Sequence, residues 1–424
     1  MQSKASTSAS KATASAGAKK TIRVKSSGTA SSSSSIPAGM PSVTRGRQVK
    51  DVLMFTLTNA DVSLANALRR TMIGSIPVPA MVGFPHAKST IRFVKNTTRL
   101  NNEMLKSRIQ CVPVHTKGVT EAAADLYSLQ VHVSVKNTTE NMIYVTTEDF
   151  RVYNKTTRGY LPDSVARKMF PKNDRTGMFV DLVRLHPPAV ANVMQTNAST
   201  SSRSLGEELE FLADLMLVTP ADDSAFNAVS TCAYSYTSDE SKLKAAWALK
   251  EKTYETKEDA MRDMPDWFVL NKQRNYVPNS FDFVIETVGT HTNEEIVVRA
   301  CEIIVEQMNA TLEHVAAFAT NRAIRPANRI SENCYDVVFP DTYTIGKLLE
   351  KELFRLYFRD EPTQASPMTF CAFVKDHPQS PTSTLRLAFA EAKEYPYLLE
   401  CLSAAADVCL KRVVEVSRYF TASK

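Results

Sequence analysis

Two neighbouring arginines, Arg69 and Arg70, are the residues whose type and spacing most clearly suit chemistry, and that chemistry is binding. A guanidinium group presents a planar fork of N–H donors that matches a carboxylate and also donates to carbonyl oxygens. The small residues Ala65 and Ala67 precede the pair, so a second backbone can approach this segment closely. This composition predicts a packed contact with another polypeptide, with the arginines at its rim. The alternative is a solvated helix face.

No catalytic or metal-binding pattern accompanies the arginines. Two-metal chemistry needs clustered carboxylates, and the chain has no Asp-x-Asp-x-Asp run. Its 12 glycines form no phosphate loop, its seven histidines have no ligand spacing, and its seven cysteines never stand as C-x-x-C. We therefore expect no catalytic residue, metal or cofactor in this chain, and the reduced thiols of an intracellular protein. No stretch approaches the ~18 apolar residues of a membrane span.

A short strand and a capped helix position the arginines. Alternating apolar residues at 53, 55 and 57 predict a half-buried strand. Asn59 or Asp61 can then accept hydrogen bonds from the free N–H groups of a first helical turn. Leu64, Leu68 and Met72 share one face of that helix, and two prolines at 77 and 79 end it.

The middle of the chain, from about 126 to 276, has a β-rich pattern. Alternation over 129–135, a turn at 137–139 and apolar residues at 143 and 145 predict a hairpin. Further strands are expected at 211–218 and 229–236, and a polar loop at 199–204. The segment 243–267 is charged and reads as irregular, with Trp247 and Trp267 anchoring it.

The last third repeats a strand–helix plan. A strand at 281–287 leads to a long helix that Thr292 or Asn293 caps, and after a polar linker at 321–331 a second strand precedes a helix at 344–354. Strands at 370–374 and 385–389 and a final helix follow. We expect the long helices at 294–319 and 397–419 to pack together, because each carries a continuous apolar stripe. Together with two residues of the 344–354 helix, these helices supply the residues expected at the internal dimerisation contact, namely Val297, Ala300, Ile304, Met308, Leu348, Leu349, Leu399, Leu402, Ala406 and Val413.

The positive charge lies at the N-terminus. Nine of the 51 basic residues and none of the 45 acidic residues lie in residues 1–50, so the remainder is slightly acidic, near −3. Residues 1–47 are rich in Ser, Ala, Thr and Lys and predict a disordered basic tail. Such a tail suits a stand-alone nucleic-acid-binding adaptor, whereas a dedicated binder should carry a basic face on its folded part.

The segment around the arginines resembles the signature helix of the α-type RNA polymerase subunits. That family comprises bacterial α, archaeal D and the third-largest subunit of eukaryotic RNA polymerase II. Its pattern S-x-A-N-A-L-R-R-x-M stands here as SLANALRRTM at 63–72, followed by Ile76-Pro77. The resemblance continues in TIRFV at 90–94, NTT at 96–98, VPV at 112–114 and FDFVIETVG at 281–289.

The C-terminal part resembles the smaller α-like partner, namely archaeal L and the eleventh subunit of the eukaryotic enzyme. The family pattern H-T-L-G-N-L-L-x-x-E-L stands here as YTIGKLLEKEL at 343–353. The pattern F-x-A-Y-x-x-x-H-P stands as FCAFVKDHP at 370–378. Tyr343 replaces the usual His and Lys347 the usual Asn, which changes any polar contact that these side chains make.

The two resemblances together imply an α+β fold with two α-subunit-like halves paired as an internal pseudo-dimer. The larger half would use 48–114 and 276–322 for dimerisation, with a β-rich insertion at 115–275, and the smaller half would span 323–424. The implied function is a non-catalytic assembly platform of a DNA-directed RNA polymerase. Fusion of the halves is typical of large DNA viruses of eukaryotes, which implies a location in the virion and infected cell.

The resemblance also implies partners. Asn66, Arg69, Arg70 and Thr71 would contact the second-largest subunit, and the smaller half would face the largest subunit, which is expected to hold the catalytic Mg. A small zinc-binding subunit is a further possible neighbour, and DNA would be contacted only through the complex. The adaptor that uses the basic tail is the alternative function.

Overall fold

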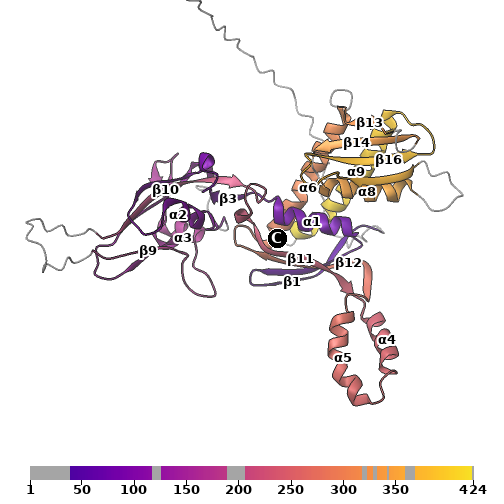
Figure 1. Ribbon diagram of the computed structural model, residues 1–424, viewed down its shortest axis with the longest axis horizontal. Helices are drawn as coiled ribbons and strands as arrows, with labels where there is room; N and C mark the ends of the chain where they lie inside the picture. The colour runs from indigo at the N-terminus through magenta and orange to yellow at the C-terminus, as the bar shows by residue number, and fades with distance from the viewer. Residues whose placement is uncertain are drawn as a thin grey trace, which may run out of the picture. The chain divides into compact units, whose positions relative to one another are not determined.

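The computed structural model describes residues 39–116, 126–188, 206–317, 322–327, 332–340, 343–358 and 368–422. They all belong to one compact unit, Ala38–Lys424. Helices and antiparallel sheets both contribute, so the fold is α+β (Figure 1). Short 3-10 turns lie at His86–Lys88, Leu126–Ser128, Thr147–Asp149 and Ser224–Phe226.

A four-stranded sheet in the order β1-β2-β12-β11 supports the arginine-bearing helix. Its strands are β1 (Ser42–Val49), β2 (Val52–Thr58), β11 (Val229–Ser238) and β12 (Tyr276–Thr287). The expected alternation in β2 is confirmed, because Leu53, Phe55 and Leu57 are buried. Phe55 stacks on Phe283 of the neighbouring β12 at 5.0 Å between ring centroids.

Strand β1 corrects the expected tail boundary. It begins at Ser42 and pairs with β2, so the prediction of disorder was wrong for 42–47. The side chains of this segment offer little apolar surface, but backbone hydrogen bonds to β2 and a 2.6 Å bond between the Ser42 and Thr58 hydroxyls hold it. Residues 1–38 lie outside the described part of the chain.

Helices α1 (Val62–Gly74) and α6 (Asn293–Ala316) pack on this sheet, and the C-terminal helix α9 (Tyr395–Ala422) also contacts its strand β1. Asp61 caps α1 by accepting from the Leu64 N–H at 2.9 Å. Thr292 caps α6 in a capping box with Glu295, which satisfies two free backbone donors reciprocally.

A second sheet has its own apolar core and takes segments from both sides of the expected boundary at 114. Its order is β3-β10-β5-β7-β8, with β4 also paired to β10. The strands are β3 (Val78–Met81), β4 (Ile91–Asn96), β5 (Leu129–Lys136), β7 (Arg151–Asn154), β8 (Gly159–Tyr160) and β10 (Glu208–Val218). The helices α2 (Asn102–Gln110) and α3 (Asp163–Met169) belong to the same part.

Sheet membership therefore does not follow the expected residue limits. Strands β3 and β4 lie within the expected dimerisation segment 48–114, yet both pair with β10, which is 11 residues long and has room for both. Conversely β11, expected in the insertion, returns to the first sheet beside β12.

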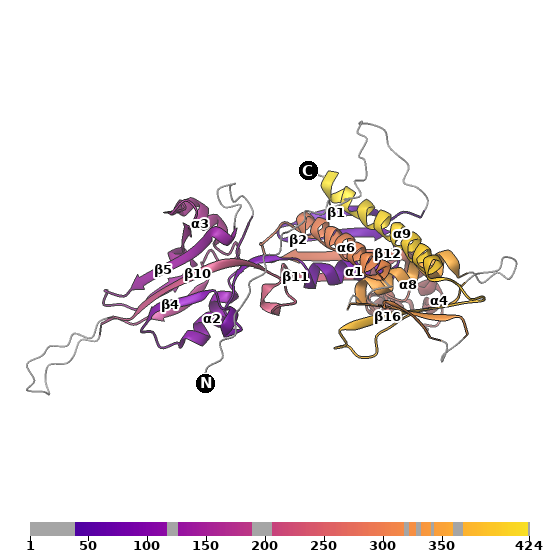
Figure 2. The ribbon, with the colours of Figure 1, turned by 90° about the horizontal axis from the view of Figure 1, so that it is seen from above.

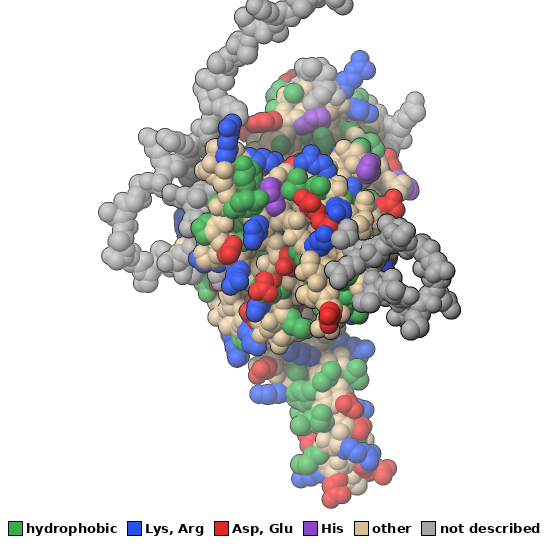
Figure 3. Space-filling model, turned by 90° about the vertical axis from the view of Figure 1, so that its left-hand side faces the viewer, with side chains coloured by type: hydrophobic (Ala, Val, Ile, Leu, Met, Phe, Trp, Pro, Cys, Tyr) green, Lys and Arg blue, Asp and Glu red, His purple; other side chains and the backbone are tan. Residues whose placement is uncertain are grey.

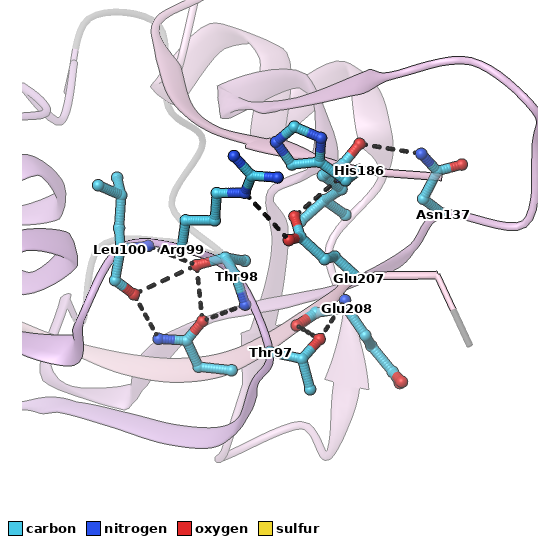
Figure 4. A network of polar contacts seen from close by, with 10 residues as sticks. Thr97, Thr98, Arg99, Leu100, Asn137, His186, Glu207 and Glu208 are labelled. Carbon is cyan, nitrogen blue, oxygen red and sulfur yellow. Dashed lines mark hydrogen bonds and ion pairs between the residues drawn. The ribbon is translucent and has the colours of Figure 1, made fainter. Parts of the chain in front are cut away.

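The predicted hairpin over 129–145 is wrong. Strand β5 pairs with β10 and β7, whereas β6 (Ile143–Thr146) pairs with β9 (Asp181–Leu185). The buried Asn137 lies directly after β5, where the chain leaves this sheet and continues to β6. Its Nδ2 atom donates to the carbonyls of Asn141 and Leu185 at 2.8 and 2.9 Å. Figure 4 shows this side chain beside His186 and Glu207, whose carboxylate accepts from the His186 N–H at 2.8 Å.

The segment 243–267, which was expected to be irregular, is helical instead. It forms the helices α4 (Glu240–Glu251) and α5 (Lys257–Asn271), each with a side-chain N-cap, from Asp239 and Thr256. Trp247 and Trp267 pack at 5.2 Å between centroids, so their anchoring role is confirmed. The polar loop predicted at 199–204 lies outside the described residues.

A third sheet, β13-β14-β16-β15, forms the C-terminal part. Its strands are β13 (Ile324–Pro326), β14 (Cys334–Pro340), β15 (Met368–Val374) and β16 (Thr382–Phe389), with the helices α8 (Tyr343–Tyr357) and α9 (Tyr395–Ala422). Helix α9 packs on α6 and α8, and α1 packs on both α6 and α8 (Figures 1 and 2). One continuous apolar core runs through these helices and joins the first sheet, β1-β2-β12-β11, to the third sheet, β13-β14-β16-β15.

Candidate protein-binding site

Helix α1 presents its two arginines differently. Leu64, Leu68 and Met72 are buried in the core, which turns the opposite face outward. Arg70 is exposed, whereas Arg69 is half-buried. The Nε and Nη2 atoms of Arg69 donate to the Asn66 Oδ1 atom at 3.1 and 3.0 Å, which fixes one edge of its guanidinium group.

The C-terminal end of α1 lines a groove of about 730 Å³. Arg69, Arg70 and Lys375 supply its charged groups, and Gln307 of α6 contributes an amide. The Arg70 guanidinium carbon lies 5.5 Å from the centroid of the Tyr343 ring, a cation–π arrangement across α1 and α8. The full lining is Arg69, Arg70, Thr71, Ile73, Gly74, Ser75, Gln307, Tyr343, Thr344, Lys375 and Pro378.

The four residues expected to bind a partner lie together on α1 but are not equally accessible. Asn66 and Arg69 are half-buried and Arg70 is exposed. Thr71 lines the groove, but only 3% of it is exposed, so it supports the groove floor more than it offers a contact.

The residues expected to pair the long helices lie in the shared core. Nine are buried, and Leu399 is partly buried against the same cluster. The buried ones are Val297, Ala300, Ile304, Met308, Leu348, Leu349, Leu402, Ala406 and Val413.

Sequence reasoning missed an ionic cluster between α1, α8 and α9. The Arg412 guanidinium donates to Asp61 Oδ2 at 3.1 Å, to Glu352 Oε1 at 2.5 Å and to the Asn59 carbonyl at 3.0 Å. Arg355 holds the other oxygen of Glu352 at 2.7 Å. The only signal available was a charged residue inside the apolar stripe of α9, between the buried Cys409 and Val413.

Buried thiols show no sign of reactivity. Desolvation raises the pKa of the buried Cys232 and Cys301 and of the partly buried Cys371 to about 12, because an apolar surrounding disfavours the thiolate. Within the described ranges, no group of three or more His, Cys, Asp or Glu side chains is placed to hold a metal ion. No helix in that part of the chain is long and apolar enough to cross a membrane.

Comparison with known protein families gives one match. Residues 54–308 match the model of the RNA polymerase Rpb3/Rpb11 dimerisation domain. This match spans more than half of the chain and includes α1, the second sheet, the first sheet apart from β1 and the start of β2, and most of α6. No curated protein matches the chain. The chain therefore belongs to the Rpb3/Rpb11 dimerisation-domain family of RNA polymerase subunits.

Proposed function

We propose that this chain is a non-catalytic assembly platform of a DNA-directed RNA polymerase. It holds the second-largest subunit on the outer face of α1 and the largest subunit near the C-terminal part. The catalytic Mg lies on the largest subunit, and this chain supplies no cofactor. A small zinc-binding subunit is a further neighbour.

One observation carries this proposal. The family's signature helix packs its apolar face into the core and leaves Arg70, with one edge of Arg69, at the surface. No carboxylate among the described residues pairs with either guanidinium. Arginines that are held in place but lack an acidic partner suit an interface with another chain.

The proposal includes two α-like halves that pair inside one chain as a pseudo-dimer. It is supported by the packing of α6 on α9 and by the core that both sheets share. A short linker raises the effective concentration of one half at the other to the millimolar range. Fusion of this kind supports an origin in a large DNA virus, with the protein acting in the virion and infected cell.

Co-expression tests the function directly. The full chain is produced with the two largest polymerase subunits of the same source, and the mixture is separated by size. We expect one complex that contains all three chains. Elution of this chain apart from both large subunits refutes the proposal.

The alternative, a nucleic-acid-binding adaptor, has less support. On the face drawn in Figure 3, basic and acidic side chains are interspersed and form no continuous basic track. A binder of nucleic-acid backbones needs such a track. Salt-dependent binding of DNA by the free chain, with no capture of a large subunit, favours the adaptor.

A further inference from the structure

Helix α5 leaves an apolar stripe in solvent. Met261 and Val269 are 71% and 74% exposed, and Pro265 between them is exposed as well. Residues four apart lie on the same side of a helix, so the three side chains form a row about 12 Å long. Contiguous exposed apolar surface, unlike a single exposed residue, marks a contact site for another molecule.

The α4–α5 hairpin does not need this stripe for its own fold. Its core lies on a different side of α5, where Trp267 packs on Trp247 of α4 at 5.2 Å between ring centroids and Ala260 is only 2% exposed. Side-chain caps begin both helices. The stripe is therefore free to bury its apolar surface against another chain.

The stripe leads into a hollow of about 400 Å³ between the end of the hairpin and the first sheet. Phe268, next to Val269, lines it together with Lys272, and Ser238 at the end of β11 contributes a hydroxyl. Strand β1 contributes Arg45, which lies at a bulge and has a φ of 55°. A bulge redirects a side chain out of the regular alternation of a strand, which is how β1 supplies a cation here.

Three polar groups of the hollow have no partner among the described residues. The Ser238 Oγ atom is buried and makes no hydrogen bond there. Neither Arg45 nor Lys272 forms an ion pair with an Asp or Glu of that part of the chain. A buried hydroxyl without a partner costs free energy, and two cations beside it favour an anionic hydrogen-bond acceptor.

The two acidic residues in the wall are engaged elsewhere. The Asp282 carboxylate accepts from the hydroxyls of Thr56 and Thr237 at 2.7 and 3.0 Å. Glu240 lies 4.0 Å from the Lys244 amine on the solvent side of α4. With these acids in its wall, the hollow suits a single carboxylate and offers no extended basic path for a nucleic-acid backbone.

We propose that α5 and this hollow form one docking site for an amphipathic segment of another protein chain. Apolar side chains of the segment cover Met261 and Val269. One of its carboxylates enters the hollow, where Arg45 and Lys272 attract it and the Ser238 hydroxyl donates to it. The site shares no residue with the groove at the end of α1, so the inference goes beyond the proposed function.

Site-specific photo-cross-linking in the tagged full chain tests the contact. Met261→benzoylphenylalanine, produced in the natural source and irradiated there, should form an adduct with another protein chain. Mass spectrometry should place the adduct in a segment that combines apolar residues with Asp or Glu.

Leu270→benzoylphenylalanine is the matched control, because Leu270 is 73% exposed and lies on the opposite side of α5 from Met261. It should form no adduct with that segment. The proposal is wrong if position 261 forms no adduct, if both positions reach the segment equally, or if the segment carries no acidic residue. An adduct with a second copy of this chain or with nucleic acid also overturns it.

Charge reversal tests the hollow. Lys272→Glu should lower the yield of the position-261 adduct about tenfold, because the carboxylate of the segment then meets a like charge. Lys252→Glu is the control, an exposed lysine at the end of α4 that does not line the hollow, and it should leave the yield unchanged. Equal yields from the two variants contradict a carboxylate in the hollow.

Ser238→Ala separates docking from folding. The free chain should melt at an unchanged temperature, because the Ser238 Oγ atom makes no hydrogen bond among the described residues, while the yield of the position-261 adduct should fall. An unaltered yield refutes the role of this hydroxyl. If a variant does not fold, as judged by circular dichroism, the adduct from position 261 with an intact hollow decides.

Discussion

Replacement of Arg412 by Met tests how the C-terminal helix holds the arginine-bearing helix. The Arg412 side chain is 12% exposed and bonds Asp61, the N-cap of α1, and Glu352, which is 3% exposed. Removing one member of a buried ion pair typically costs 3–5 kcal/mol, because the remaining charge stays desolvated. Glu352 keeps Arg355 at 2.7 Å, so we expect about 3 kcal/mol, the lower end of that range.

The assay is urea unfolding followed by circular dichroism, with the midpoint and slope compared between variants. Arg418→Met is the matched control, because Arg418 lies on the same helix, is 72% exposed and pairs only with the nearby Glu415 among the residues described. An exposed pair of this kind contributes ~0.2–1 kcal/mol. If Arg412→Met costs no more than Arg418→Met, the ionic cluster does not join the helices as we describe.

A second variant separates the ion pair from packing. Arg412→Met combined with Glu352→Leu removes both charges and replaces them with apolar groups. Because the buried Glu352 carboxylate is then not left without Arg412, the double variant should be more stable than the sum of the single changes by about 1–3 kcal/mol. Additive effects would show that the two side chains act independently.

Three further predictions concern the core, the surface and pH. Ile304→Ala or Leu402→Ala should lower the free energy of unfolding by ~2–5 kcal/mol each, measured by urea titration, because both side chains are buried in the shared core. Reversing Arg69 and Arg70 to Glu should change the free energy of unfolding by no more than ~1 kcal/mol, so the melting temperature should change little. The same change should make the free energy of partner binding less favourable by about 2–5 kcal/mol. Burial lowers the pKa of His291 from its ordinary 6.5, so the unfolded chain binds more protons below that pH; stability should fall from about pH 7 to pH 5, and less in His291→Gln.

Each of these three predictions has its own control or contrary result. Val414→Ala on α9, at a half-exposed position, should stay within ~0.5 kcal/mol; equal effects at Leu402 and Val414 would contradict the core packing. An arginine double variant that melts early but still captures its partner would assign the pair to the core. A His291→Gln chain with an unaltered pH profile would show that another group causes the acid sensitivity.

Elements with strong local signals could be predicted from the sequence. The stripes of α6 and α9 have helical spacing over many turns, and Thr292 and Asp61 offered cap side chains, so these helices were expected close to their observed ends. Apolar residues at helical spacing indicate which face of a helix is buried in the core, so such helices can be predicted from local sequence.

Elements that depend on distant partners could not be predicted in this way. Strand β5 alternates well, but its partner β10 lies far along the chain, and nothing local favours it over β6. Helix α5 contains Pro265 and little buried surface, so its periodicity was weak. Arg412 and Asp61 are 351 residues apart, and no spacing rule connects them.

Only the α1 side of the candidate site could be predicted from the sequence. The arginines of α1 stand in a motif, whereas Tyr343 and Lys375 reach the same groove because the C-terminal sheet and α8 pack against α1. Their contribution follows from tertiary packing and not from local sequence.

Purification of the tagged full chain from its natural source, followed by mass spectrometry of the chains that accompany it, tests the central claim most directly. The account predicts the two largest subunits of a DNA-directed RNA polymerase in equal amounts with this chain, and their loss when Arg69 and Arg70 are both reversed to Glu. Recovery of the chain without either large subunit would contradict its role as an assembly platform.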